Sequence, residues 1–121
     1  MNIFDLKPKA KEQIIHDLSR LSQEDKNINL ILASSNGYKD IVKILLKNGA
    51  DINTKDGAGW TPLIWAIGNQ DEKMTSLLLN AKADVNIKDK SNNTPLEIAL
   101  WSGETDIVKL LKKYGAKERK L

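Results

Sequence analysis

The feature that most constrains this chain is an ungapped self-similarity with a period of 33 residues. The segments that coincide after shifts of one or two periods are Thr61–Leu63 with Thr94–Leu96, Ala50–Asn53 with Ala83–Asn86, and Ile41–Leu45 with Ile107–Leu111. A constant period over most of a chain is typical of a solenoid, in which each unit buries its apolar face against its neighbours.

The period divides the chain into three units, 23–55, 56–88 and 89–121, preceded by residues 1–22. We expect all 121 residues to form a single domain. The leading segment carries an apolar stripe on a helix predicted over about residues 9–21, which we expect to cover the first unit; its members are Ile14, Ile15, Leu18 and Leu21, with His16 beside them. No signal peptide or membrane span is recognisable, so we expect a cytoplasmic protein.

Each unit is expected to contain two short helices and a turn. Thr61 and Thr94 are placed to cap the first helix, with proline following each of them and Glu97 completing a capping box after Thr94. Glycines stand where the helices should end, at positions 37, 49, 103 and 115, but the middle unit has Gln70 and Lys82 instead. We expect a left-handed backbone at Lys82; a shifted turn is the alternative.

Composition excludes several classes of function. The chain has no cysteine and one histidine, which removes disulfides, thiolate chemistry and the common zinc sites. Aspartates such as Asp56 and Asp89 recur with the repeat, which marks them as turn residues rather than a catalytic pair. We therefore expect no enzyme activity, no cofactor and no metal. A net charge of +3 is too small to indicate a nucleic-acid or membrane partner, and we interpret the basic tail as a solvated end cap: Lys112, Lys113, Lys117, Arg119 and Lys120.

The repeated residues resemble the ankyrin repeat. The middle unit reads Asp56-Gly57-Ala58-Gly59-Trp60-Thr61-Pro62-Leu63, then Leu77-Leu78-Leu79, then Ala83-Asp84-Val85-Asn86. The first unit is degenerate, because Ile28-Asn29-Leu30 replaces Thr-Pro-Leu and Gln23 replaces the turn aspartate. The resemblance implies an all-α solenoid of stacked helix–turn–helix units with projecting turns. The last unit carries Lys112 where Leu46 and Leu79 stand, as expected for the end of a stack.

The resemblance also implies that partners bind the turn tips and the first helices. Mapped onto this sequence, the expected partner-binding residues are Ser35, Asn36, Ala58, Trp60, Asn69, Lys90, Ser91, Asn93, Trp101 and Ser102, together with Gly57 and Gly68. Trp60 and Trp101 should face outward, where tryptophan is enriched in interface hot spots. Trp60 packed on its own turn, or Trp101 packed near Tyr114, are the alternatives. Trp65 aligns with Leu32 and Ile98, so we expect it in the core.

The resulting prediction is a non-enzymatic protein–protein interaction module that binds one folded protein, with no nucleic acid or membrane involved, and that is a monomer when free. A dedicated inhibitor or immunity protein that blocks an enzyme or toxin is the narrower alternative, and a host-directed bacterial effector is another. Loss of activity in a co-purified enzyme would separate these alternatives from a general binding module.

Overall fold

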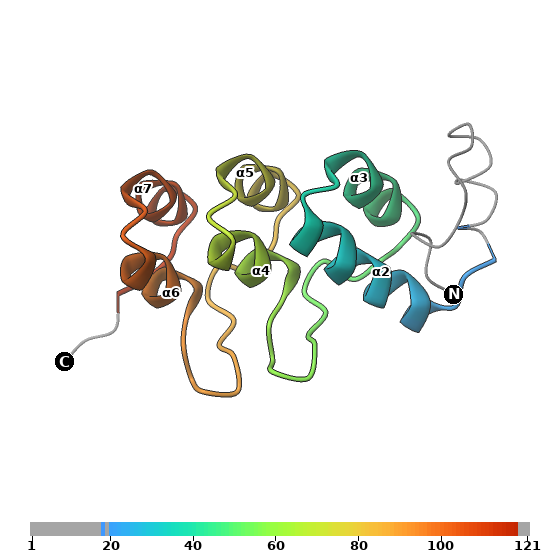
Figure 1. The fold of residues 1–121 in the computed structure, drawn as a ribbon, viewed down its shortest axis with the longest axis horizontal. Helices are drawn as coiled ribbons and strands as arrows, with labels where there is room; N and C mark the ends of the chain where they lie inside the picture. Colours follow the sequence, from blue (N-terminus) through green and yellow to red (C-terminus); the bar gives the residue numbers. More distant parts are fainter. Residues whose placement is uncertain (1–17, 19, 119–121) are drawn as a thin grey trace.

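The computed structural model describes residue 18 and residues 20–118, and within them the chain is helical, with no β-strand. The helices are α2 (Gln23–Asn36), α3 (Lys39–Lys47), α4 (Pro62–Gly68), α5 (Glu72–Asn80), α6 (Pro95–Ser102) and α7 (Thr105–Lys113). Figure 1 shows α2, α4 and α6 in one row and α3, α5 and α7 in a second, with two loops projecting beyond the first row. The predicted all-α solenoid is confirmed. None of these helices has the length and apolar character needed to span a membrane.

The predicted helix starts in the second and third units are confirmed by their caps. The Thr61 side chain accepts a hydrogen bond from the backbone N–H of Ile64, 3.2 Å away. Thr94 accepts one from the N–H of Glu97 at 3.1 Å, and the Glu97 carboxylate accepts one from the N–H of Thr94 at 3.0 Å. These bonds satisfy amide groups that have no partner inside the helix, so α4 and α6 begin at their prolines.

The middle unit keeps the turn geometry of its neighbours without their glycines. Gln70 and Lys82 have φ values of 58° and 72°, in the left-handed region. The aligned glycines adopt the same region, for example Gly37 at 76° and Gly49 at 93°. The predicted left-handed backbone at Lys82 is therefore confirmed, and the alternative of a shifted turn is wrong.

The first unit departs from the expected plan of a turn followed by a short helix. Its first helix, α2, begins at Gln23, after the N-cap Ser22, whose side chain accepts a bond from the Asp25 amide at 3.1 Å. The later units have a projecting loop over the aligned residues. Without the Thr-Pro pair that starts α4 and α6, nothing interrupts the helix, and buried Asn29 donates from its side chain to the Asp25 carbonyl at 2.8 Å.

A single apolar core runs through the stack between the two rows of helices. It includes Leu30, Val42 and Leu45 from the first unit, and Leu18 and Leu21 from the leading segment are also buried in it. Burial of these two leucines agrees with the expected apolar stripe. Ile14, Ile15, His16 and most of the helix predicted over about residues 9–21 lie outside the described residues.

At the other end of the stack, the last unit combines polar and apolar exposure. Lys112, aligned with the buried Leu79, is exposed and forms an ion pair with Glu118 at 2.8 Å. Leu100, however, is 48% exposed, whereas the aligned Ile67 is completely buried under the third unit. Arg119 and Lys120 of the basic tail lie outside the described residues.

Candidate functional site at the tips and first helices

The two projecting loops end in turns of the same construction, tip 2 (residues 56–61) and tip 3 (residues 89–94). In tip 2, one carboxylate oxygen of Asp56 accepts the backbone N–H groups of Ala58 and Trp60, each at 2.9 Å. In tip 3, Asp89 accepts those of Ser91 and Asn93 at the same distance. The aspartates are therefore structural turn residues, as the repeat predicted, and each holds its tip in a defined conformation.

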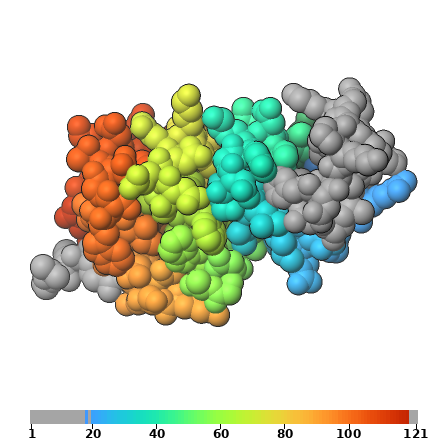
Figure 2. All heavy atoms as spheres, viewed as in Figure 1, coloured from blue at the N-terminus to red at the C-terminus, as the bar shows by residue number. Residues whose placement is uncertain are grey.

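The two tips also contact each other directly. The backbone N–H of Lys90 donates to the carbonyl of Ala58 at 3.0 Å. Gly59, with φ of 79°, lies directly beneath this contact, and a Cβ atom there would be 2.7 Å from the Lys90 nitrogen. The aligned Asn92 has φ of 65° and carries a side chain. Figure 2 shows the two tips, in green and orange, side by side at one edge of the molecule.

Asparagine side chains connect the bases of successive loops. Asn53 accepts the backbone N–H of Asp84 at 2.9 Å, and Asn86 accepts that of Lys117 at 3.3 Å. In the first unit, where the tip is missing, Asn27 on α2 accepts the N–H of Asp51 at 2.8 Å. The bonds of Asn53 and Asn86 join one unit to the next, whereas the bond of Asn27 lies within the first unit.

Trp60 does not project freely from tip 2. Its indole is half-buried, packs against the core and covers Gly68 at the end of α4, where an added Cβ would be 3.1 Å from the ring. The ring N–H donates to Asp89 of the next unit at 3.1 Å. The expected outward-facing indole is therefore only partly exposed. The alternative, packing on its own turn, is also incomplete, because the ring bridges a helix and the neighbouring tip.

Trp65 corrects the prediction of a core tryptophan. It is half-buried rather than buried, and its indole N–H donates to the Asp56 carboxylate at 2.8 Å. The indole also meets Trp60 edge-on, with ring centroids 4.9 Å apart and planes at 70°. Leucine or isoleucine at this position has no polar group to satisfy, whereas an indole N–H must reach an acceptor, and the acceptor lies at the surface.

The Asp89 carboxylate links the two tips electrostatically. Burial raises the pKa of this carboxyl, but hydrogen bonds from the Asn93 amide, the Trp60 indole, the Asn93 side chain and the Ser91 amide outweigh it and hold the pKa below its ordinary value. Each of these donors interacts more strongly with the ionised carboxylate than with the neutral acid. The charged form of Asp89 therefore stabilises the native tips.

Trp101 on α6 is the most exposed large apolar side chain of the described residues, at 66%. Packing near Tyr114, the alternative, would require a covered ring; instead the Tyr114 hydroxyl donates to Asn80. Seven other predicted partner-binding residues are exposed as well: Asn36, Gly57, Ala58, Gly68, Asn69, Lys90 and Ser91.

The remaining predicted residues are half-buried and bonded locally. The hydroxyl of Ser35 donates to the Leu32 carbonyl, and that of Ser102 to the Ile98 carbonyl, both at 3.0 Å. Asn93 belongs to the bonded turn of tip 3. Asn69, although exposed, donates to the Ser35 carbonyl at 2.8 Å, so it joins two neighbouring first helices.

One apolar part of this surface was missed by the sequence reasoning. Because the first unit has no tip, a hollow of about 630 Å³ lies between α2 and the loop at residues 54–57. Ile28, Ile31 and Leu32 line it, and Ile28 is 48% exposed. Their spacing of three and four residues on one helix was the available signal.

Within the described residues, no group of three histidine, aspartate or glutamate side chains is arranged to hold a metal ion. The aspartates that recur with the repeat accept hydrogen bonds from backbone amides of their own turns. The Asp51 carboxylate, for example, accepts the backbone N–H of Asn53.

Comparisons with known proteins agree with this geometry. A segment of 38 residues is 58% identical to an ankyrin repeat protein of Rickettsia bellii (strain RML369-C), covering 31% of this chain and 16% of that protein. A segment of 54 residues is 41% identical to the 26S proteasome non-ATPase regulatory subunit 10 of Mus musculus, covering 43% of this chain and 23% of the relative. A third segment, of 34 residues, is 47% identical to protein phosphatase 1 regulatory subunit 12A of Rattus norvegicus, covering 28% of this chain and 3% of that protein.

The matched segments thus span less than a quarter of each of these relatives. The family model for ankyrin repeats, in three copies, matches residues 30–120, which is most of the chain. Repeats of this family mediate protein–protein interaction, and the family and the regulatory-subunit relatives indicate a non-catalytic interaction module. With its period, caps, tips and stacked helix pairs, the chain belongs to the ankyrin repeat family.

Proposed function

We propose that this protein binds one folded protein partner through the partner surface, by which we mean tips 2 and 3 together with the exposed faces of α2, α4 and α6. The observation that carries the proposal is Trp101, an indole exposed over 66% of its surface on the first-helix row. An exposed tryptophan leaves a large apolar area in water, and tryptophan is among the residues that contribute most when an interface covers them.

The rigidity of the tips supports the same function. Ala58, Lys90 and Ser91 are exposed, while the backbone beside them is held by the Asp56 and Asp89 carboxylates. A surface that is already ordered loses little conformational entropy when a partner binds. The hollow beside Ile28 extends this surface along α2 and offers an apolar recess for a partner side chain.

Two relatives are named regulatory subunits, of a proteasome particle and of a protein phosphatase. This favours the narrower form of the proposal, in which binding changes the activity of a partner enzyme, as a dedicated inhibitor or an effector would. In this form the partner surface covers a functional site of the enzyme, and the protein is a monomer until it binds.

The test compares proteins captured from the source cells by the wild type, by Trp101→Ala and by Tyr114→Ala. Tyr114 is an exposed aromatic residue at the end of α7, in the other row of helices, so its variant is the matched control. We expect one protein to be retained by wild type and Tyr114→Ala and lost with Trp101→Ala. Isothermal titration of the purified pair should then show binding weakened at least about tenfold, as for a hot-spot tryptophan.

Capture that is unaffected by Trp101→Ala and by Lys90→Glu would contradict the proposed surface. If the captured protein is an enzyme, its activity measured with and without the ankyrin protein decides the narrower form. Unchanged activity at saturation would leave a binding module and exclude an inhibitor.

A further inference from the structure

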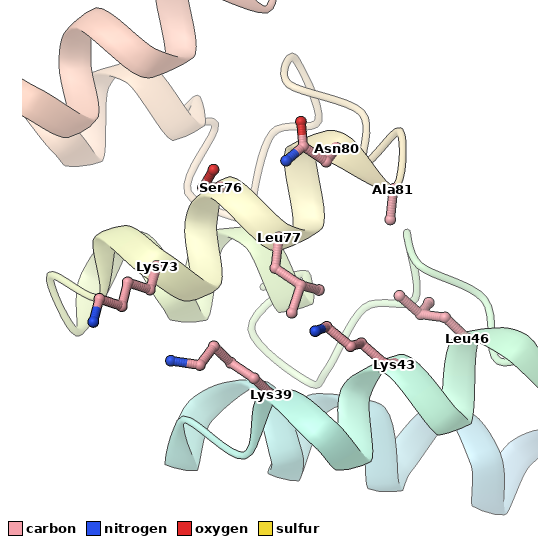
Figure 3. A pocket seen from close by; sticks show the side chains of 8 residues that line it. All are labelled: Lys39, Lys43, Leu46, Lys73, Ser76, Leu77, Asn80 and Ala81. Atoms are coloured by element: carbon pink, nitrogen blue, oxygen red, sulfur yellow. The ribbon is translucent and has the colours of Figure 1, made fainter.

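A groove of about 600 Å³ lies between α3 and α5 (Figure 3). Both helices belong to the second row, away from the tips (Figure 1). The residues of the groove fall into two groups along its length. Leu46, Leu77 and Ala81 form an apolar part, and Lys39, Lys43 and Lys73 form a basic part. Figure 3 shows the Lys39 and Lys43 side chains extending from α3 toward α5, with Lys73 at the end of the groove near the start of α5.

The groove is open because the outer helices are unevenly spaced. α5 packs against α7 more closely than α3 packs against α5. Two aligned leucines show the consequence: Leu79, facing the third unit, is 2% exposed, whereas Leu46, facing the second, is only half-buried. Apolar surface therefore remains uncovered between the first and second units.

Acidic residues lie near the basic part of the groove but outside its lining, because Asp40 follows Lys39, and Asp71 and Glu72 line a neighbouring hollow with Lys73. No aspartate or glutamate lines the groove, and among the described residues none forms an ion pair with Lys39, Lys43 or Lys73. Cations held close together by two helices raise the local positive potential, although the whole chain has a net charge of only +3.

Lys73 stands at a position where helix physics favours an acid. It lies in the first turn of α5, and the aligned residues in the first turns of α3 and α7 are Asp40 and Asp106. Acidic side chains stabilise the amino end of a helix, and a lysine there is unfavourable. In α5 the acid of the first turn is the preceding residue, Glu72, so the middle unit keeps an acid there and places a lysine in the lining of the groove.

We propose that this groove is a second docking site, which binds an acidic amphipathic helix of a protein partner. Carboxylates on one face of that helix pair with Lys39, Lys43 and Lys73, and apolar side chains on the adjoining face cover Leu46 and Leu77. α3 and α5 each contain nine residues, so a partner segment of about ten residues, roughly 15 Å of helix, matches the length of the groove. This site is distinct from the partner surface proposed above.

The apolar part of the groove favours a peptide over a nucleic acid. A phosphate backbone would be attracted to the lysines but would leave Leu46 and Leu77 in contact with polar groups. An amphipathic helix satisfies both parts of the groove at once, in the way that helices bind hydrophobic grooves with a charged rim.

The probe is a fluorescent peptide of about ten residues with leucines on one helical face and glutamates beside them. A peptide with lysine for each glutamate and a single-stranded oligonucleotide are the comparison probes. We expect the acidic peptide alone to bind, and Lys43→Glu/Lys73→Glu to weaken it at least about tenfold. The matched control, Lys88→Glu/Lys109→Glu, changes the net charge equally at exposed lysines outside the groove and should leave binding within about twofold.

A second variant separates the groove from diffuse attraction. Ser76 lines the groove and aligns with Lys43 and Lys109, so Ser76→Lys introduces a side chain that this helical position already accepts in two units. Ser76→Lys adds positive charge but fills the groove, and we expect it to weaken peptide binding. Three outcomes would overturn the proposal. The peptide could bind Ser76→Lys more strongly than the wild type, or the control variant could lose as much binding as Lys43→Glu/Lys73→Glu. The oligonucleotide could also bind and be weakened equally by Lys43→Glu/Lys73→Glu. Trp101→Ala should leave peptide binding unchanged, which distinguishes this site from the partner surface.

Discussion

The second and third units each place a tryptophan on the same surface, the second from its tip and the third from its first helix. In the second unit the indole comes from the tip, as Trp60, and the helix position beneath it is Gly68. In the third unit the aligned residues are Asn93 in the tip and Trp101 on the helix. Trp60 is half-buried and donates a hydrogen bond to Asp89, whereas Trp101 is 66% exposed.

This exchange shows how the same residue type can be packed into one repeat and left exposed in the next. A glycine on α4 leaves room for the tip indole to lie against the helix, and the next tip supplies the acceptor for its N–H. In the third unit, none of the described residues covers the indole on α6 in that way. Contacts with the neighbouring tip and helix, rather than the repeat pattern, determine how much of each tryptophan is exposed.

The largest expected effect tests the contact between the tips. Gly59→Ala should lower the free energy of unfolding by about 3 kcal/mol, because the new Cβ meets the Lys90 nitrogen and the backbone is left-handed. Asn92→Ala, at the aligned position in tip 3, should cost about 1 kcal/mol or less. Urea unfolding of both variants measures the difference. Equal losses would mean that the tips do not depend on each other.

The second prediction separates the two tryptophans. Trp60→Ala should lower the free energy of unfolding by about 2 kcal/mol through lost packing and a lost hydrogen bond. Trp101→Ala should change it by less than about 1 kcal/mol, as at an exposed position, and should instead weaken partner binding. Paired denaturation and titration experiments provide the check. The distinction drawn above is wrong if Trp101→Ala is the more destabilising of the two.

The third prediction concerns the ionised Asp89 carboxylate of tip 3, which accepts a hydrogen bond from Trp60 of tip 2. The pKa of Asp89 is lowered in the native state, so its contribution is present at neutral pH and is lost as the pH falls below the ordinary value for aspartate. Trp60→Phe keeps an aromatic ring and removes one donor, so the pKa of Asp89 should rise toward its ordinary value. The variant should be less stable by about 1 kcal/mol at pH 7, and the difference should disappear in acid.

NMR titration of the Asp89 carboxyl checks the shift directly. An unchanged pKa in Trp60→Phe would show that the backbone amides of tip 3 alone stabilise the charge. In that case the indole would contribute packing only.

The smallest effect concerns the left-handed residue of the middle unit. Lys82→Gly should raise the free energy of unfolding by less than about 1 kcal/mol, because relief of the left-handed backbone is offset by the greater freedom of glycine in the unfolded chain. Thermal melts compare the variant with the wild type. A lower melting temperature would indicate that the Lys82 side chain stabilises the end of α5 by more than the backbone costs.

Much of the fold could be predicted from local chemistry. Thr94 and Glu97 specify a helix start through bonds within three residues, and glycines with positive φ specify helix ends, so these features were recognisable without a structure. The extension of α2 was harder to anticipate, because it depends on the absence of the Thr-Pro signal. For the candidate site, the sequence identified the residues of the tips but not the contacts of Trp60 and Trp65, because these depend on neighbouring elements.

The sequence by itself determined the period, the helix pairs, the caps and the turns, because each depends on residues close together in the chain. Only the tertiary structure decided which side chains are exposed and which contacts they make with neighbouring units. The bond from Trp60 to Asp89 joins residues of different units, and the groove beside Leu46 depends on the spacing of α3 and α5. Such contacts join residues of neighbouring units. The distances and angles of these contacts follow from how the units pack, which the 33-residue pattern does not specify.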